Sequence, residues 1–352
     1  MRLFISLSLV SFFLSFFGTW VVWSLAKRKK WFDVVNERKA HHREVPRLGG
    51  IPLVVSFMVC FGIVILLASR GKMPHGSFTS LYIPFLIILF LGIYDDFKGA
   101  NAYQKFFFQI ISALIIFHLS YRIQLLSVPF SGSVRVGVFW SYFLTVLWVV
   151  FAINAFNLID GLDGLLTRIA LYASLSMLVI FFVRGQSFLA GITLILSAAL
   201  LGFLPWNLYP AKIFLGDSGS MFLGLVFAVL AMASSQKGPV AMSMAVPILI
   251  VIVPFLDTLW AFIRRIMHGK SPFKADMGHI HHKIFMRIGD HRKASFILSS
   301  LSGLFSLIGI FAAFASPRYR GFIVGLAFLI GIVLFLKLGV LKAKMDINTD
   351  MK

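Results

Sequence analysis

The chain has 352 residues, of which 59% are hydrophobic and only 13% are charged. Soluble domains carry about 25% charged residues, so this composition excludes a water-soluble globule and indicates a membrane protein with many spans. The formal net charge of +20 is typical of basic loops on the cytoplasmic side of a membrane protein, and we expect no nucleic-acid partner.

Long apolar runs predict eleven membrane-spanning helices, with ten as the alternative count, because a span needs about 20 apolar residues. The first run is too long for a signal peptide and its basic cluster follows it, so we expect a retained helix with the amino terminus outside. The one cysteine, Cys60, lies in the second run and excludes a disulfide framework or a thiolate metal site. The runs are 3–26, 48–69, 78–94, 104–119, 137–157, 164–183, 187–206, 217–234, 239–263, 294–315 and 321–341.

This topology puts the odd-numbered loops and the carboxyl terminus in the cytoplasm, where most of the 33 Lys and Arg residues then lie. Of the 13 acidic residues, only Asp257 falls well inside a predicted span. Acidic residues contribute little to orientation, so their collection on one face indicates a metal-dependent site.

The segment 120–136 is expected to form a short outer hairpin. We therefore predict an all-α polytopic membrane protein with one domain, 1–352, and with cytoplasmic active-site loops at 27–47, 95–105, 158–164, 207–217 and 264–293.

Two short motifs place carboxylates at the ends of predicted spans. Asp95 and Asp96 follow the third span, and adjacent carboxylates at a membrane boundary need a cation or a proton unless they form a solvated helix end. Asp217 opens the eighth span within the small-residue stretch 214–220. An aspartate in that position is ordinarily an N-cap. Beside a metal site it would instead be a ligand, because Mg²⁺ prefers carboxylate oxygens.

Polar side chains also leave the fifth span at every third position, as Asn154, Asn157, Asp160 and Asp163. Steps of three residues drift by about 60° per step on an α-helix. The four side chains therefore converge only if the segment bends or unwinds, which Gly161 permits. Capping of a helix end explains one or two of these residues, whereas the full set favours a site.

The longest inner loop, 264–293, combines basic residues with His279, His281 and His282. Clustered histidines often bind zinc, but there is no thiolate partner and no His-Glu-x-x-His spacing. We interpret the histidines and the basic residues as donors to a ligand that carries phosphate. Attraction to anionic lipid headgroups explains part of the basic charge.

Over nearly its whole length the chain resembles the polyprenyl-phosphate N-acetylhexosamine-1-phosphate transferase family. The His-Ile-His-His form of the last motif is similar to the WecA/TagO-type branch, whereas the related MraY branch tends towards three consecutive histidines. The resemblance lies in five ordered motifs: Arg38 to His41 leading to Pro46 to Gly50, the pair Asp95-Asp96, Asn154 to Gly164, Phe214 to Ser220, and Ser271 to Asp276 followed by His279 to His282.

The resemblance implies transfer of N-acetylhexosamine-1-phosphate, with GlcNAc-1-phosphate favoured, from a UDP-N-acetylhexosamine to undecaprenyl phosphate, releasing UMP. This would be the first membrane step of a cell-surface polysaccharide pathway. The resemblance also implies Mg²⁺, with Mn²⁺ as a substitute, a cytoplasmic-face site in the bacterial inner membrane, contact with membrane lipids, and room for a homodimer. The alternatives are an MraY-like phospho-MurNAc-pentapeptide transferase and a multi-span transporter, although a transporter should show paired repeats with charges near the midplane.

The resemblance also assigns roles to particular residues. Asp217, with Asn157, would hold Mg²⁺ and the donor diphosphate, and Lys105 would meet the same diphosphate. Asp95 would deprotonate or orient the lipid phosphate. The other assigned residues are Asp96, Asp160 and Asp163 as further catalytic carboxylates, and Asn154, His279, His281 and His282 as substrate-binding groups.

Overall fold

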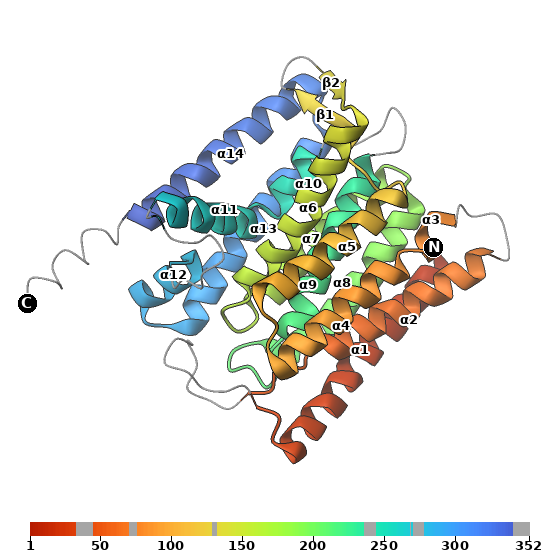
Figure 1. Ribbon diagram of the computed structural model, residues 1–352, viewed down its shortest axis with the longest axis vertical. Coiled ribbons are helices and arrows are strands. Elements are labelled where there is room, and N and C mark those ends of the chain that lie inside the picture. Colours follow the sequence, from red (N-terminus) through yellow and green to blue (C-terminus); the bar gives the residue numbers. More distant parts are fainter. Residues whose placement is uncertain are drawn as a thin grey trace, which may run out of the picture.

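The computed structural model describes residues 1–32, 45–69, 76–128, 132–235, 244–267, 269 and 278–340. Within these ranges the chain forms a bundle of helices with one small hairpin of two strands (Figure 1). In chain order the elements are α1 (Arg2–Lys29), α2 (Gly50–Ser69), α3 (Gly76–Thr79), α4 (Tyr82–Lys98), α5 (Ala102–His118), β1 (Leu125–Val128), β2 (Gly132–Arg135), α6 (Val138–Ile159), α7 (Leu165–Val183), α8 (Ser187–Asn207), α9 (Gly216–Ser235), α10 (Ala245–Ile250), α11 (Ile252–Met267), α12 (Ile280–Ile288), α13 (His291–Phe314) and α14 (Pro317–Val340).

The all-α polytopic architecture is confirmed, because eight helices in the described part of the chain are long and apolar enough to cross a membrane. Two further predicted spans correspond to α4 and α5, which have 17 residues each. The total of eleven spans and their orientation remain predictions. The eight long helices are α1, α2, α6, α7, α8, α9, α13 and α14.

The ninth predicted span, 239–263, is wrong as a single continuous helix. Its described part is divided, because α10 ends at Ile250 and α11 begins at Ile252. Val251 between them has φ −110° and ψ 27°. Pro247 and Pro254 each lie in the first turn of one of these helices, where the missing N–H of proline breaks no helical hydrogen bond. Hydropathy cannot detect this division, since both halves are apolar.

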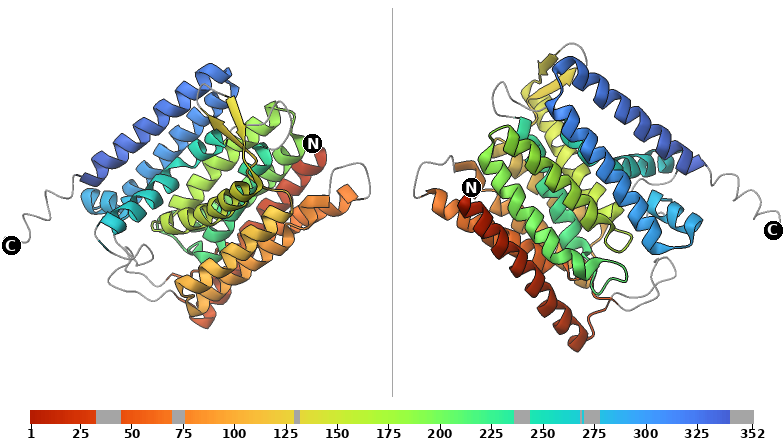
Figure 2. Two further views of the ribbon diagram at one scale, coloured as in Figure 1. Left: turned by 45° about the horizontal axis from the view of Figure 1, so that its top comes forward. Right: turned by 180° about the vertical axis from the view of Figure 1, so that it is seen from behind.

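The central helix of the bundle is α9, whose residues from Gly216 to Ser234 are buried within the protein. It packs against α2, α4 and α6, and Figure 2 shows the helix bundle from two further sides. A helix that is apolar on all faces belongs in such a buried position. The start of α9 carries the Gly-Asp-Ser-Gly motif, so the fold places this motif among three other helices.

The predicted hairpin within 120–136 is confirmed, with β1 and β2 antiparallel and Leu125 opposite Arg135. It precedes the amino-terminal end of α6, whereas the motif beginning at Asn154 lies at the opposite end of that helix. Next to the hairpin, the side chains of Phe139 and Trp140 are exposed. Exposed aromatic side chains at a helix end are typical of a membrane–water interface. The hairpin and the candidate site therefore lie at opposite ends of the bundle (Figure 1).

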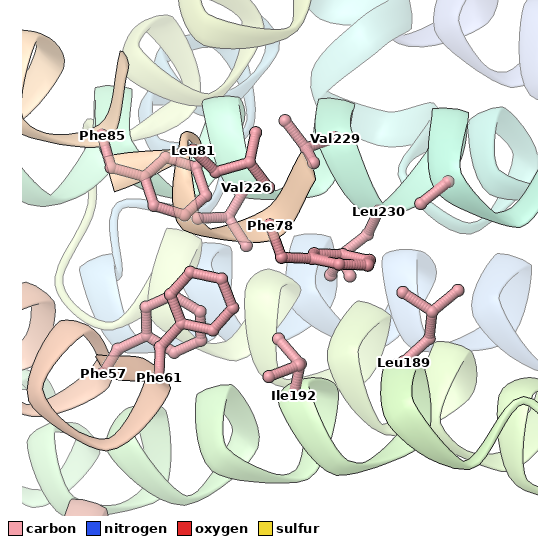
Figure 3. Close-up of a pocket in the computed structure, with 11 residues that line it drawn as sticks. Phe57, Phe61, Phe78, Leu81, Phe85, Leu189, Ile192, Val226, Val229 and Leu230 are labelled. Atoms are coloured by element: carbon pink, nitrogen blue, oxygen red, sulfur yellow. The ribbon is translucent and has the colours of Figure 1, made fainter. Parts of the chain in front are cut away.

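An apolar pocket lies away from that motif end, between α2, α3, α4, α8 and α9 (Figure 3). Phe57, Phe61, Phe78 and Phe85 line it together with aliphatic side chains. The residues that line this pocket include no polar side chain. It therefore offers nothing to bind a phosphate or a metal, and we do not assign it to the site.

Candidate active site

The first turn of α9 lies in a cradle that requires glycine. A Cβ on Gly50 of α2 would lie 2.2 Å from the backbone nitrogen of Gly219, and a Cβ on Gly92 of α4 would lie 2.3 Å from Cα of Ser218. Gly216 has φ +73°, a backbone conformation that side chains disfavour. The absence of side chains at these positions lets the backbones of α2 and α4 approach the turn that carries the motif aspartate.

Asp96 holds this turn through both carboxylate oxygens. Its Oδ1 accepts a hydrogen bond from the backbone nitrogen of Asp217 at 2.7 Å, and its Oδ2 accepts one from the nitrogen of Ser218 at 3.1 Å. These are the free amides that every helix start must satisfy. Burial and the nearby charge of Asp217 raise the pKa of Asp96 to about 7, although the hydrogen bonds to Ser218 and Asp217 oppose that shift. The capping role that the sequence allowed for Asp217 therefore belongs to Asp96.

Asp95 and Asp217 meet around one lysine. The ammonium of Lys105 contacts Oδ2 of Asp95 and lies 3.5 Å from Oδ1 of Asp217. Arg47 approaches the other oxygen of Asp217, with Nη2 to Oδ2 at 3.5 Å. Burial, followed by the charge of Asp217, raises the pKa of Asp95. Two predicted carboxylates and the predicted lysine are thus in contact, and Arg47, which belonged to a motif but was assigned no role, joins them.

The unwinding predicted after the fifth span is present, since α6 ends at Ile159 and α7 begins only at Leu165. Asn157 contacts the Asp217 carboxylate, and its Oδ1 accepts a hydrogen bond from Oγ of Ser220 at 3.1 Å. Asp160 follows at the end of the helix, where burial raises its pKa to about 8 against the opposing charge of Arg47. Asn157 and Asp160 are therefore part of the same cluster as Asp217.

Asn154 lies one turn deeper than Asn157 along α6. Its Nδ2 donates to Oε1 of Gln109 at 2.7 Å and to the carbonyl of Val150 at 2.7 Å. Gln109 is fully buried in α5, one turn from Lys105. Asn154 therefore ties α5 to α6 beneath the carboxylates. The sequence reasoning missed Gln109, although a polar residue four positions from Lys105 in an apolar helix was an available signal.

Asp163 is directed away from the other carboxylates, although the sequence grouped it with Asp160. Its Oδ2 accepts a hydrogen bond from the backbone nitrogen of Ala211 at 2.9 Å. Its Oδ1 lies 3.8 Å from Nε2 of His291, and Oγ of Ser295 donates to its backbone oxygen at 2.8 Å. Asp163 thus fastens the α8–α9 connection to the start of α13.

The predicted histidines gather around an aspartate that the sequence reasoning left without a role. Nδ1 of His279 lies 3.1 Å from Oδ2 of Asp257, and Nδ1 of His281 lies 3.9 Å from the same oxygen. The ring of His282 lies beside that of His281, with centroids 4.3 Å apart and planes tilted by 41°. A Cβ on Gly161 would lie 2.1 Å from Nε2 of His281, so the histidines adjoin the loop that follows Asp160. Burial lowers the pKa of His281 to about 3.

Two parts of the predicted motifs, 38–41 and 271–276, lie outside the described residues. In the described part of the chain, no group of three or more His, Cys, Asp or Glu side chains is arranged to hold a metal by itself. The structure brings together Asp95, Asp96, Lys105, Asn157, Asp160 and Asp217, with His279, His281 and His282 grouped at the adjoining Asp257.

Comparisons with known proteins identify the family of the chain. A family model described as glycosyl transferase family 4 matches residues 78–235. A probable undecaprenyl-phosphate N-acetylglucosaminyl 1-phosphate transferase from Bacillus subtilis is 35% identical over 79% of this chain and 76% of its own length. A decaprenyl-phosphate N-acetylglucosaminephosphotransferase from Mycolicibacterium smegmatis is 31% identical over 92% of this chain and 85% of its own. An undecaprenyl-phosphate alpha-N-acetylglucosaminyl 1-phosphate transferase from Escherichia coli K12 is 31% identical over 83% and 79%. The family resemblance in the motifs is thus confirmed, and the chain belongs to glycosyl transferase family 4.

Proposed function

We propose that this protein transfers GlcNAc-1-phosphate from UDP-GlcNAc to undecaprenyl phosphate, with release of UMP, at the cytoplasmic face of a bacterial inner membrane. The observation that carries the proposal is the meeting of Asp95 and Asp217 around Lys105 at the motif end of the bundle. The names of the relatives, all polyprenyl-phosphate GlcNAc-1-phosphate transferases, support the transferred group and the acceptor.

The cluster fits a divalent cation by its charge and by its donor atoms. Its four carboxylates face two cationic side chains, and burial together with the charge of Asp217 raises the pKa of the other three, a cost that a divalent cation would lower. Mg²⁺ is commonly held by one or two carboxylates together with substrate phosphates. Asp217 and the amide oxygen of Asn157 would hold the ion, with the donor diphosphate completing its shell. When bound, the ion would neutralise charge on the diphosphate as the leaving UMP forms.

The chain's own groups then have separate tasks. Lys105 and Arg47 would bind the donor diphosphate and reduce the repulsion between the two anionic substrates. Asp95 would orient the acceptor phosphate and take its proton. The lipid phosphate would attack the sugar-linked phosphorus directly, since phosphate is a competent nucleophile once its charge is screened. The anomeric bond stays intact, so the configuration of the sugar is retained.

The histidine group would complete the donor site. It adjoins the loop at Gly161 and lies beside the carboxylates. Imidazole groups can donate to phosphate oxygens or to the sugar. We assign His279, His281 and His282 to the donor's phosphate and sugar end.

The experiment is an assay of the purified protein in lipid nanodiscs with undecaprenyl phosphate and a panel of UDP-sugars, with and without Mg²⁺ and tunicamycin. We expect UMP and undecaprenyl-diphospho-GlcNAc in equal amounts, dependent on the metal. Product from UDP-MurNAc-pentapeptide instead would favour the MraY-like alternative. Failure to form a lipid-linked sugar diphosphate from every UDP-N-acetylhexosamine would refute the proposal.

A further inference from the structure

Asp257 is an acidic side chain that the proposed reaction does not use. It lies on α11, within a predicted span, and is 2% exposed. A buried carboxylate in a membrane protein is costly and is retained where it has a specific partner. Its two oxygens have different partners, and both partners belong to the histidine motif.

The first partner fixes the backbone of the motif. Oδ1 of Asp257 accepts a hydrogen bond from the backbone nitrogen of Ile280 at 2.8 Å. Ile280 is the first residue of α12, and His279 is its N-cap residue. The side chain of His279 makes no capping hydrogen bond of its own. Asp257 therefore satisfies a free amide at the start of α12 from a different helix.

The second partner fixes one imidazole ring. Oδ2 of Asp257 lies 3.1 Å from Nδ1 of His279. An ionised carboxylate can only accept, so Nδ1 must carry the proton and donate it. The other ring nitrogen, Nε2, then points away from Asp257 and is the nitrogen left for a ligand. When the ring carries a second proton, Nε2 can donate it to a phosphate oxygen.

The neighbouring histidine limits how far the first ring can move. The rings of His279 and His281 stack with centroids 5.6 Å apart and planes 16° apart. His281 in turn meets Gly161, so its ring lies between Asp257 and the loop after Asp160. The pair of rings is therefore held between α11 and the α6–α7 connection.

From this geometry we infer that Asp257 is a positioning residue, which holds His279 with Nδ1–H turned inward and Nε2 presented to the diphosphate of the nucleotide-sugar donor. The inference rests on the proposed function for the identity of the ligand. The division of the ninth predicted span bears on this role. A new helix, α11, begins at Ile252, and Asp257 in this helix contacts the histidine motif. Asp257 touches His279 and acts through it.

The kinetic test compares Asp257→Asn, His279→Gln and the double variant, with KM measured separately for UDP-GlcNAc and undecaprenyl phosphate. Loss of the partner that orients a metal-ligating histidine typically costs about 10–100-fold, and we take the same scale for a histidine that binds phosphate. We expect a rise of that size in KM for the donor, an unchanged KM for the lipid, and a double variant no worse than His279→Gln alone. Equal losses for both substrates, additive losses, or wild-type behaviour of Asp257→Asn would overturn the inference.

The matched control is Asp290→Asn. Asp290 also accepts a hydrogen bond from a backbone amide at a helix start, that of Lys293 at 3.0 Å, but it is exposed and its ion-pair partner is the same lysine. Asparagine is as good an N-cap as aspartate. This variant should therefore match the wild type, and a loss equal to that of Asp257→Asn would overturn the inference.

A spectroscopic test is independent of activity. In ¹⁵N-histidine-labelled protein, the imidazole signals of His279, assigned by their absence in His279→Gln, should show a protonated Nδ1 in the wild type. They should change in Asp257→Asn and stay unchanged in Asp290→Asn. A wild-type His279 with a bare Nδ1 would overturn the inference. If the wild type transfers no sugar phosphate, the proposed function fails while this readout still decides the role of Asp257.

Discussion

Substitution of Gly92 by alanine should damage the site without changing any charged group. The new Cβ would lie 2.3 Å from Cα of Ser218 and 2.6 Å from its nitrogen, whereas ordinary contacts begin at 3.4 Å. Both obstacles are backbone atoms, so α4 and the first turn of α9 must separate by about 1 Å, at an overpacking cost of about 1–3 kcal/mol. Asp95 and Asp96 lie on α4 one turn further on and would move away from Asp217. A misplacement of this size can cost about 100-fold in rate.

The assay pairs the rate of UMP release with a measurement of unfolding. Cys60 is the one cysteine of the chain and is buried, so reaction with a thiol-specific fluorophore on heating reports unfolding. Gly325→Ala is the matched control, because a Cβ there meets nothing within 4 Å. We expect Gly92→Ala to unfold at a lower temperature and to turn over about 100-fold more slowly. If Gly92→Ala is indistinguishable from Gly325→Ala in both measurements, the reasoning about the glycine cradle is wrong.

Three further outcomes follow from the site. Asp217→Asn should abolish Mg²⁺-dependent UMP release while membrane insertion stays normal; near-normal turnover would remove this residue from the metal site. Asp95→Asn should lower kcat by about 10²–10⁴-fold with little change in donor KM, and a selective loss of nucleotide affinity would contradict its role towards the acceptor. Because burial lowers the pKa of His281 to about 3, only the unfolded chain takes up this proton below about pH 6.5. Stability should therefore fall by about 2 kcal/mol between pH 7 and pH 5, and Cys60 labelling should show a smaller fall in His281→Gln.

Much of the fold could be predicted from hydropathy, because a membrane span needs a continuous apolar run. The interruption at Val251 could not be predicted from hydropathy, because the residues on both sides of it are apolar. Pro247 and Pro254 were the available signal, each compatible with a first helical turn. The hairpin near Leu125 was predictable because polar and small residues separate two spans there.

The grouping of most site residues was also predictable, because motif residues recurred at one face and the steps of three converge only if the segment bends or unwinds. The separate role of each carboxylate could not be predicted from the sequence. Whether Asp96 or Asp95 would satisfy the amides of α9 depends on how closely two backbones approach, which sequence spacing does not reveal. Asp163 points elsewhere because the α8–α9 connection offers it an amide at Ala211. Asp257 stood out in the sequence as an acidic residue inside a predicted span, but its partner His279 is 22 residues away, so the sequence did not reveal their contact.

The shortness of α5 has a consequence for the surrounding lipid. With 17 residues and a capping box at Asn101 that fixes where it begins, this helix is about 25 Å long, less than the roughly 30 Å of a typical hydrocarbon layer. Lys105 lies in its first turn, so the ammonium lies at the edge of this predicted span. Local thinning of the leaflet is one way to cover so short a span. Thinning would draw headgroups towards this end of α5, where Asp95 meets Lys105, so the phosphate of a polyprenol could reach Asp95 while its chain stays among the acyl tails.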